Sequence, residues 1–98
     1  MQAPSLVTAF KSSSKKVMVE WSYLPAKDFK GEPIGYKVIY YPVDSESDVN
    51  FESVNYTTNT TSLTNLTVYT MYVINVSAVS SGGIGPANTV KARTGAEG

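Results

Sequence analysis

The sequence contains no histidine and no cysteine, and these two absences limit the chemistry that the chain can perform. Histidine is the most common general base and metal ligand at neutral pH, and a cysteine thiolate is a strong nucleophile. Catalytic arrangements of the Ser-His-Asp and Cys-His types are therefore impossible, as is a thiolate metal site. A serine–lysine pair could come only from Ser12–Ser14 with Lys15 and Lys16, in a hydrophilic turn where nothing desolvates a lysine. We therefore predict that the chain is not an enzyme and needs no cofactor.

Three carboxylates at alternate positions, Asp44, Glu46 and Asp48, resemble the start of a calcium loop. Such a loop also needs a glycine at its sixth position and a glutamate at its twelfth, and the sequence has neither. No P-loop or dinucleotide-binding glycine pattern occurs, because Gly82-Gly83-Ile84-Gly85 is too compressed and opens no helix. We interpret the acidic segment as a solvated loop, and we expect no metal site and no small-molecule substrate.

The formal net charge is zero, with eight basic and eight acidic residues. A neutral chain lacks the positive surface that binds nucleic acid or an anionic membrane, so neither is an expected partner. No apolar run is long enough to span a bilayer. Membrane attachment would therefore come only through a segment elsewhere in a longer parent protein.

Four N-glycosylation sequons stand in the second half of the chain, where chance would give about one or two. Their acceptors are Asn55, Asn59, Asn65 and Asn75. The first three fall at expected strand ends or loops, and Asn75 falls on the outward side of an expected strand. The excess favours a secreted or cell-surface protein that passes through a glycosylating compartment.

Apolar and polar residues alternate in several short segments bounded by turn residues, which predicts β-strands. The longest segment, Leu66–Ala78, ends before Ser80-Ser81-Gly82-Gly83, and we expect it to be the central strand, with Tyr72, Ile74, Val76 and Ala78 facing the core. Residues 16–23 should form a strand with Val17, Val19, Trp21 and Tyr23 inward, and residues 35–41 one with Tyr36, Val38 and Tyr40 inward. Further strands are expected at 6–10, 49–56, 60–63 and 87–93, with loops between them and no helix. The chain should be a single all-β domain, residues 1–98, with its core at about 4–94 and short linker-like termini.

Several landmarks carry a family resemblance through their joint order and spacing: Pro4, Trp21, Gly35-Tyr36-x-Val38-x-Tyr40, Leu66 six positions before Tyr72, and the glycine-rich segment that ends at Gly85-Pro86. Over nearly its whole length the chain resembles a fibronectin type III domain. The resemblance implies a seven-stranded immunoglobulin-like β-sandwich in which Tyr72 forms a tyrosine corner. We expect a structural core of Trp21, Tyr36, Val38, Leu66, Tyr72, Ile74 and Val76.

The resemblance also implies a role: one repeat of a larger animal cell-surface receptor or adhesion protein, acting outside the cell as a non-catalytic interaction and spacer module. Its partners would be other proteins and the neighbouring domains of its own chain. A repeat of a matrix protein, an accessory module of a secreted carbohydrate-active enzyme and an engineered binder scaffold are the alternatives. The Arg-Gly-Asp tripeptide of the family's best-known integrin-binding member is missing from Ser80–Gly85, so integrin binding by that route is not implied.

Two surfaces are candidates for contacts with a partner. One is a set of outward apolar side chains on the central sheet, Ile39 and Tyr41 near Val73, although single exposed apolar residues often have no function. A glycan on Asn75 would cover part of that face. The other comprises the loops Ser81–Gly85 and Leu24–Pro33 at one end of the sandwich. Ile84 lies at the tip of the first loop, where it either contacts a partner or folds back onto the sandwich.

Overall fold

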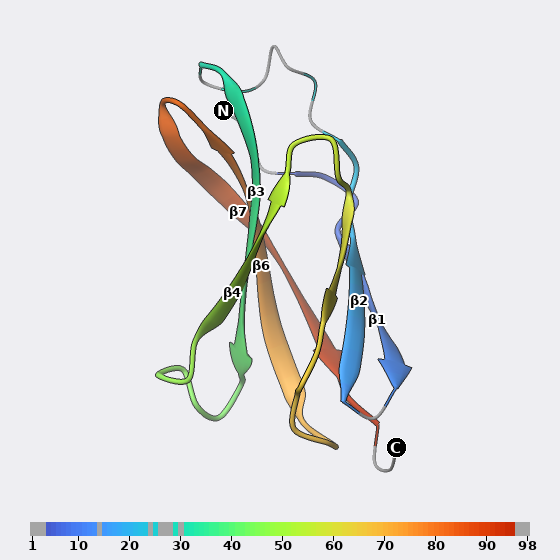
Figure 1. Cartoon of the computed structure of the whole chain (residues 1–98). Coiled ribbons are helices and arrows are strands. Elements are labelled where there is room, and N and C mark those ends of the chain that lie inside the picture. Colours follow the sequence, from blue (N-terminus) through green and yellow to red (C-terminus); the bar gives the residue numbers. More distant parts are fainter. Residues whose placement is uncertain (1–3, 14, 24, 26–28, 30, 96–98) are drawn as a thin grey trace.

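A computed structural model describes residues 4–13, 15–23, 25, 29 and 31–95 of the chain, and it contains seven β-strands (Figure 1). In chain order the strands are β1 (Thr8–Ser13), β2 (Lys16–Glu20), β3 (Pro33–Pro42), β4 (Asn50–Asn55), β5 (Thr60–Leu63), β6 (Met71–Ser80) and β7 (Gly83–Arg93). These described residues include no helix, and hence none that could cross a membrane.

The strands form two antiparallel sheets that pack face to face. One sheet has three strands in the order β1-β2-β5, and the other has four in the order β4-β3-β6-β7. Consecutive strands change sheet between β2 and β3 and on either side of β5, which closes the two layers around one core (Figure 1). The all-β sandwich expected from the sequence is confirmed.

The core is built by alternation on the long strands. The pairs Tyr36↔Ala78, Val38↔Val76 and Tyr40↔Ile74 place three cross-strand neighbours of β3 and β6 on the inner face. Opposite them, Val17, Val19 and Leu63 of the three-stranded sheet have no exposed surface. One cluster of buried residues therefore fills the space between the sheets, as the period-two pattern requires.

The central strand begins later than the sequence pattern indicated. Residues 66–70 do not join the ladder, because Asn65 (φ 57°) and Tyr69 (φ 51°) adopt left-handed backbone conformations that interrupt an extended chain. The backbone N–H of Leu66 donates instead to the carbonyl of Lys15, which lies in the connection between β1 and β2 of the other sheet. The expected strand is therefore a connection over residues 64–70 followed by β6.

The glycine-rich segment after β6 is not the open loop that we expected. β6 continues to Ser80 and β7 already begins at Gly83, so a two-residue turn closes a hairpin and Ile84 pairs with Val79. Gly83 has φ +119°, a conformation that an L-residue rarely adopts, and this explains how so short a turn is made. Ile84 does not fold back onto the sandwich, because 58% of its surface is exposed.

Two smaller boundaries also differ from expectation. β1 starts at Thr8 and runs on to Ser13, with a register shift between Lys11 and Ser13, where a turn was expected. β2 ends at Glu20, so Tyr23 is not a core residue: it is 54% exposed, and its hydroxyl donates a 2.8 Å hydrogen bond to the carbonyl of Thr57. The polar end of the tyrosine is thus held at the surface, which alternation alone cannot indicate.

Candidate functional site

The seven residues expected to form the core are all buried, none with more than 5% of its surface exposed. Around Trp21 the contacts are aromatic: its ring centroid lies 5.3 Å from that of Tyr36, which in turn lies 6.0 Å from that of Phe29. Phe29 was missed from the sequence because it stands in a charged, proline-containing segment with no alternation. The described parts of the chain offer no hydrogen-bond partner to the buried Nε1 of Trp21.

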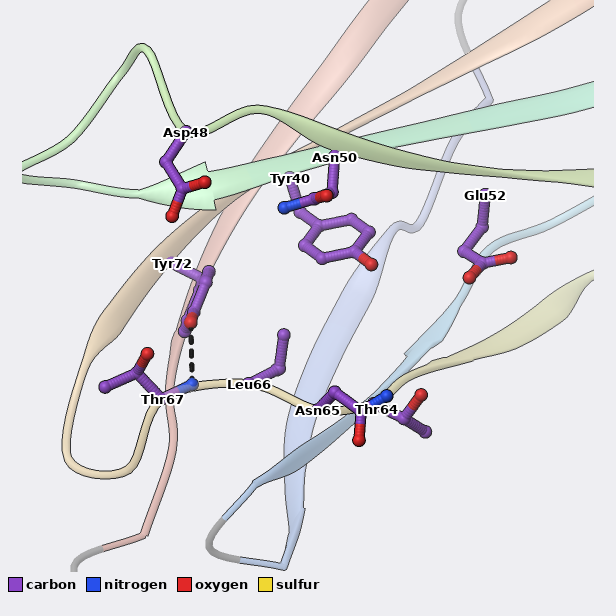
Figure 2. A pocket seen from close by; sticks show the side chains of 9 residues that line it. All are labelled: Tyr40, Asp48, Asn50, Glu52, Thr64, Asn65, Leu66, Thr67 and Tyr72. Atoms are coloured by element: carbon purple, nitrogen blue, oxygen red, sulfur yellow. Dashed lines mark hydrogen bonds between the residues drawn. The ribbon is translucent and has the colours of Figure 1, made fainter.

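Tyr72 forms a hydrogen bond across the connection that precedes its strand. Its ring is 4% exposed, and its hydroxyl accepts a 2.9 Å hydrogen bond from the backbone N–H of Thr67, five residues upstream (Figure 2). Leu66, 5% exposed, fills the core beside this bond. This arrangement is the geometry of a tyrosine corner, because an inward ring carries a hydroxyl that binds upstream backbone.

The same connection is tied to the last described residues of the chain. The hydroxyl of Thr94 accepts from the backbone N–H of Thr70 at 2.9 Å and donates to the carbonyl of Thr67 at 2.7 Å. The backbone N–H of Tyr69 donates to the carbonyl of Gly95 at 2.7 Å. The β5–β6 connection is therefore held by hydrogen bonds on both sides.

Beside this connection lies a polar cavity, the end recess, with a volume of about 280 Å³ (Figure 2). Three strands and loops contribute its lining: Tyr40, Asp48, Asn50, Glu52, Thr64, Asn65, Leu66, Thr67 and Tyr72. Figure 2 shows Tyr40 at its centre, with the hydroxyl on the side where Glu52 lies. Burial of Tyr40, and next the negative charge of Glu52, raise the pKa of this phenol. The recess was not expected, because its residues come from separate segments with no common motif.

The outer side of the four-stranded sheet carries four neighbouring apolar side chains, which we call the outer-face patch: Ile39, Tyr41, Phe51 and Val73. Val73 is itself buried, Ile39 and Tyr41 are half-buried, and Phe51 supplies most of the exposed surface. The strand register brings these residues together, since Ile39 pairs with Phe51 and Tyr41 pairs with Val73. Phe51 is 59% exposed, and the Nζ of Lys37 lies 4.5 Å from its ring centroid. Phe51 was not a candidate from the sequence. In a short edge strand, only the pairing with the neighbouring strand shows which side chains point to which face of the sheet.

The four sequon acceptors occupy different environments. Asn55 is exposed at the end of β4, and its Oδ1 accepts hydrogen bonds from both the N–H and the hydroxyl of Thr57. Asn59 is half-buried before β5, and the exposed Asn65 lines the end recess. Asn75 is half-buried on β6 opposite Ile39, and its Oδ1 accepts a 2.6 Å hydrogen bond from Thr89. A glycan on Asn75 would stand directly against the outer-face patch, so the two uses exclude each other.

The loops expected to meet at the other end of the sandwich do so through their described residues. The backbone N–H of Glu32 donates to the hydroxyl of Ser81 at 2.9 Å, and the N–H of Ser81 donates to the carbonyl of Glu32 at 3.0 Å. Residues 24, 26–28 and 30 of the Leu24–Pro33 segment lie outside the described residues.

The described residues contain no group of three or more acidic, histidine or cysteine side chains that could hold a metal ion. The acidic residues Asp44, Glu46 and Asp48 stand in the exposed β3–β4 connection. Three features distinguish the surface of the described residues: the outer-face patch, the end recess and the glycine hairpin.

Comparison with known proteins identifies a family and relatives with this architecture. The family model of the fibronectin type III domain matches residues 2–93. Protein sidekick-2 of chicken (Gallus gallus) is 42% identical over 48 residues, which is 49% of this chain but only 2% of that protein.

Two solved structures resemble nearly the whole chain. The crystal structure of the chicken CNTN1 FN1-FN3 domains superposes with a TM-score of 0.85 at 30% identity, over 97% of this chain and 32% of that one. The solution structure of the fn3 domain of human contactin 1 gives a TM-score of 0.84 at 29% identity, over 100% of this chain and 82% of that one. Matched from residue 2 to residue 93, and folded as these domains are, the chain belongs to the fibronectin type III domain family.

Proposed function

We propose that this domain is a non-catalytic interaction and spacer module of an extracellular adhesion or receptor protein. The observation that carries the proposal is the similarity to CNTN1 over 97% of the chain, where the match covers 32% of a structure composed of domains FN1 to FN3. A domain of this kind would be one unit in a row of similar units. The chain spans only 2% of the length of sidekick-2, so what the whole parent protein does is part of what we propose.

The shape of the domain suits a spacer. The described chain enters near one end of the sandwich, where the N–H of Ser22 donates to the carbonyl of Ser5, and it leaves beside Thr70 at the other end (Figure 1). The extents along the principal axes are 43 × 24 × 18 Å. Consecutive domains joined through these two ends would be spaced along the longest axis, and the sheet faces would stay open to partners.

The outer-face patch is the surface on which we place direct contact with a partner protein. Four apolar side chains from three adjacent strands lie together, and an exposed aromatic ring is a common anchor of protein interfaces. Lys37 and Lys91 border the patch, the latter through its pairing with Val73. The contact proposal applies only when Asn75 carries no glycan, for the reason given above.

The extracellular location can be tested on the parent protein. A tag placed in the parent next to this domain should be reached by antibody on intact animal cells, and N-glycosidase should lower the mass of the protein. Because Asn55 is exposed at a strand end, Asn55→Gln should remove part of this mass change, and Thr57→Ala should remove the same part while keeping the asparagine. Staining only after permeabilisation, together with a glycosidase-resistant mass, would contradict the proposal.

A further inference from the structure

The end recess contains two carboxylates without a counter-charge. Asp48 and Glu52 both line it, and neither forms an ion pair with any lysine or arginine in the described part of the chain. The lining has no basic side chain at all. At neutral pH the recess is therefore a concave negative surface on a domain whose net charge is zero.

Tyr40 supplies a second, independent observation at the recess. Its side chain is 8% exposed, yet the described residues supply no hydrogen-bond partner to its hydroxyl, which faces the recess (Figure 2). Because this oxygen is not among the fully buried polar atoms without a partner, it is open to the recess, where it can bind a ligand group. A phenol is neutral at physiological pH whether or not its pKa is raised, so the hydroxyl of Tyr40 can both accept and donate a hydrogen bond.

Size and chemistry narrow the choice of ligand. A volume of about 280 Å³ is below the range of pockets for drug-sized ligands and suits one side chain. The absence of a metal-holding group among the described residues argues against a hard cation, and a neutral sugar would leave both carboxylates without a counter-charge. A guanidinium group supplies a positive charge and five N–H donors in a planar fork, which matches carboxylates and stacks on aromatic rings.

We propose that the end recess binds the guanidinium group of an arginine side chain presented by a partner protein. Asp48 and Glu52 accept its N–H donors, and the hydroxyl of Tyr40 accepts another. This site faces away from the outer-face patch, because Tyr40 and Tyr72 belong to the inner side of their strands. The proposal therefore does not depend on the patch, nor on where the parent protein resides. A glycan on Asn65 would cover the site, because Asn65 lines it.

The test uses unglycosylated, isotope-labelled protein of residues 1–98 and follows backbone amide signals by NMR. N-acetyl-arginine amide is the probe, and we expect a saturable shift of the amides of Asn65, Thr67 and Glu52 with a dissociation constant on the order of 1–10 mM. N-acetyl-lysine amide should bind several-fold more weakly, because an ammonium cannot form the planar paired contacts. Calcium chloride and methyl N-acetylglucosaminide, added separately, should cause no saturable shift of these signals.

Variants separate specific binding from general attraction to an acidic surface. Glu52→Gln and Asp48→Asn should each weaken the arginine probe by roughly five- to tenfold, and Tyr40→Phe by about twofold. Glu46→Gln is the control, because it removes one negative charge from the exposed β3–β4 connection that also contains Asp48. Glu46 does not line the recess, so this variant should change the affinity less than about twofold.

Four results would overturn the proposal. They are no saturable shift up to about 50 mM probe, equal loss of affinity in Glu52→Gln and Glu46→Gln, equal affinity for the arginine and lysine probes, and saturable binding of the calcium ion or the sugar in place of arginine. Because the protein is neither secreted nor glycosylated in this test, its failure would leave the proposed extracellular function standing.

Discussion

The two ends of the sandwich are each organised by a buried aromatic residue, and the two are held in different ways. At one end Trp21 packs against Tyr36 with its ring nitrogen unpaired among the described residues. At the other end Tyr72 is equally buried, but its hydroxyl binds the backbone of Thr67. Apolar burial therefore dominates the first anchor, whereas the second also fixes the path of a connection. This contrast teaches that burial supplies most of the stability, while one specific hydrogen bond determines local geometry.

Replacing the tryptophan tests the first half of this comparison and should have the largest effect. Trp21→Ala removes the ring from a core where it is 2% exposed, so we expect the free energy of unfolding in urea to fall by about 3–5 kcal/mol. Tyr23→Ala is a matched control two residues away, because this ring is 54% exposed, and it should cost less than about 1 kcal/mol. Equal losses for the two variants would show that Trp21 is not the anchor of that end.

Replacing Tyr72 tests the second half of this comparison, which concerns the hydrogen bond to Thr67. Tyr72→Phe keeps the buried ring and leaves the N–H of Thr67 without its partner, which should lower the free energy of unfolding by roughly 1–3 kcal/mol. It should also speed hydrogen exchange at Thr67 and along residues 66–70 more than in the rest of the chain. Tyr69→Phe lies in the same connection on a ring that is 67% exposed, and it should stay within about 0.5 kcal/mol. An unchanged unfolding midpoint for Tyr72→Phe would mean that packing alone holds both ends.

The same contrast separates what the sequence could predict from what it could not. Alternation on β3 and β6 predicted the inner face correctly, because a period of two is a property of the strand itself. The predicted start of β6 was wrong because Asn65 and Tyr69 adopt left-handed conformations in a connection held by distant partners. Leu66, next to Asn65, donates to the carbonyl of Lys15, and Tyr69 donates to that of Gly95. Local patterns therefore predict strands well and connections poorly.

The candidate surfaces follow the same division. Ile39 and Tyr41 could be placed on the outer side by alternation, but Phe51 joins them only through the register of β4 against β3. The end recess gathers Tyr40 from β3, Glu52 from β4 and Asn65 from the β5–β6 connection, which are separated in sequence and share no motif. Such a site becomes visible only when the pairing of all three segments is known.

The smallest expected effect is electrostatic and belongs to the tyrosine end. Burial, then Glu52, then Tyr72 raise the pKa of Tyr40 above its ordinary value of 10.0 in the folded chain. The unfolded chain therefore releases this proton first as the pH rises. The stability linked to Tyr40 is complete below about pH 10 and is lost as the pH rises from there through the folded-state pKa.

Urea unfolding of the natural chain between about pH 9 and 12 should show this loss, and Tyr40→Phe should reduce it. Ultraviolet titration of the phenolates should place the Tyr40 transition above the ordinary range, and Glu52→Gln should move it part of the way back because a repelling charge has been removed. An identical pH dependence with and without the Tyr40 hydroxyl would show that burial at this end does not oppose ionisation. The tyrosine end would then differ from the tryptophan end only by the bond between Tyr72 and Thr67.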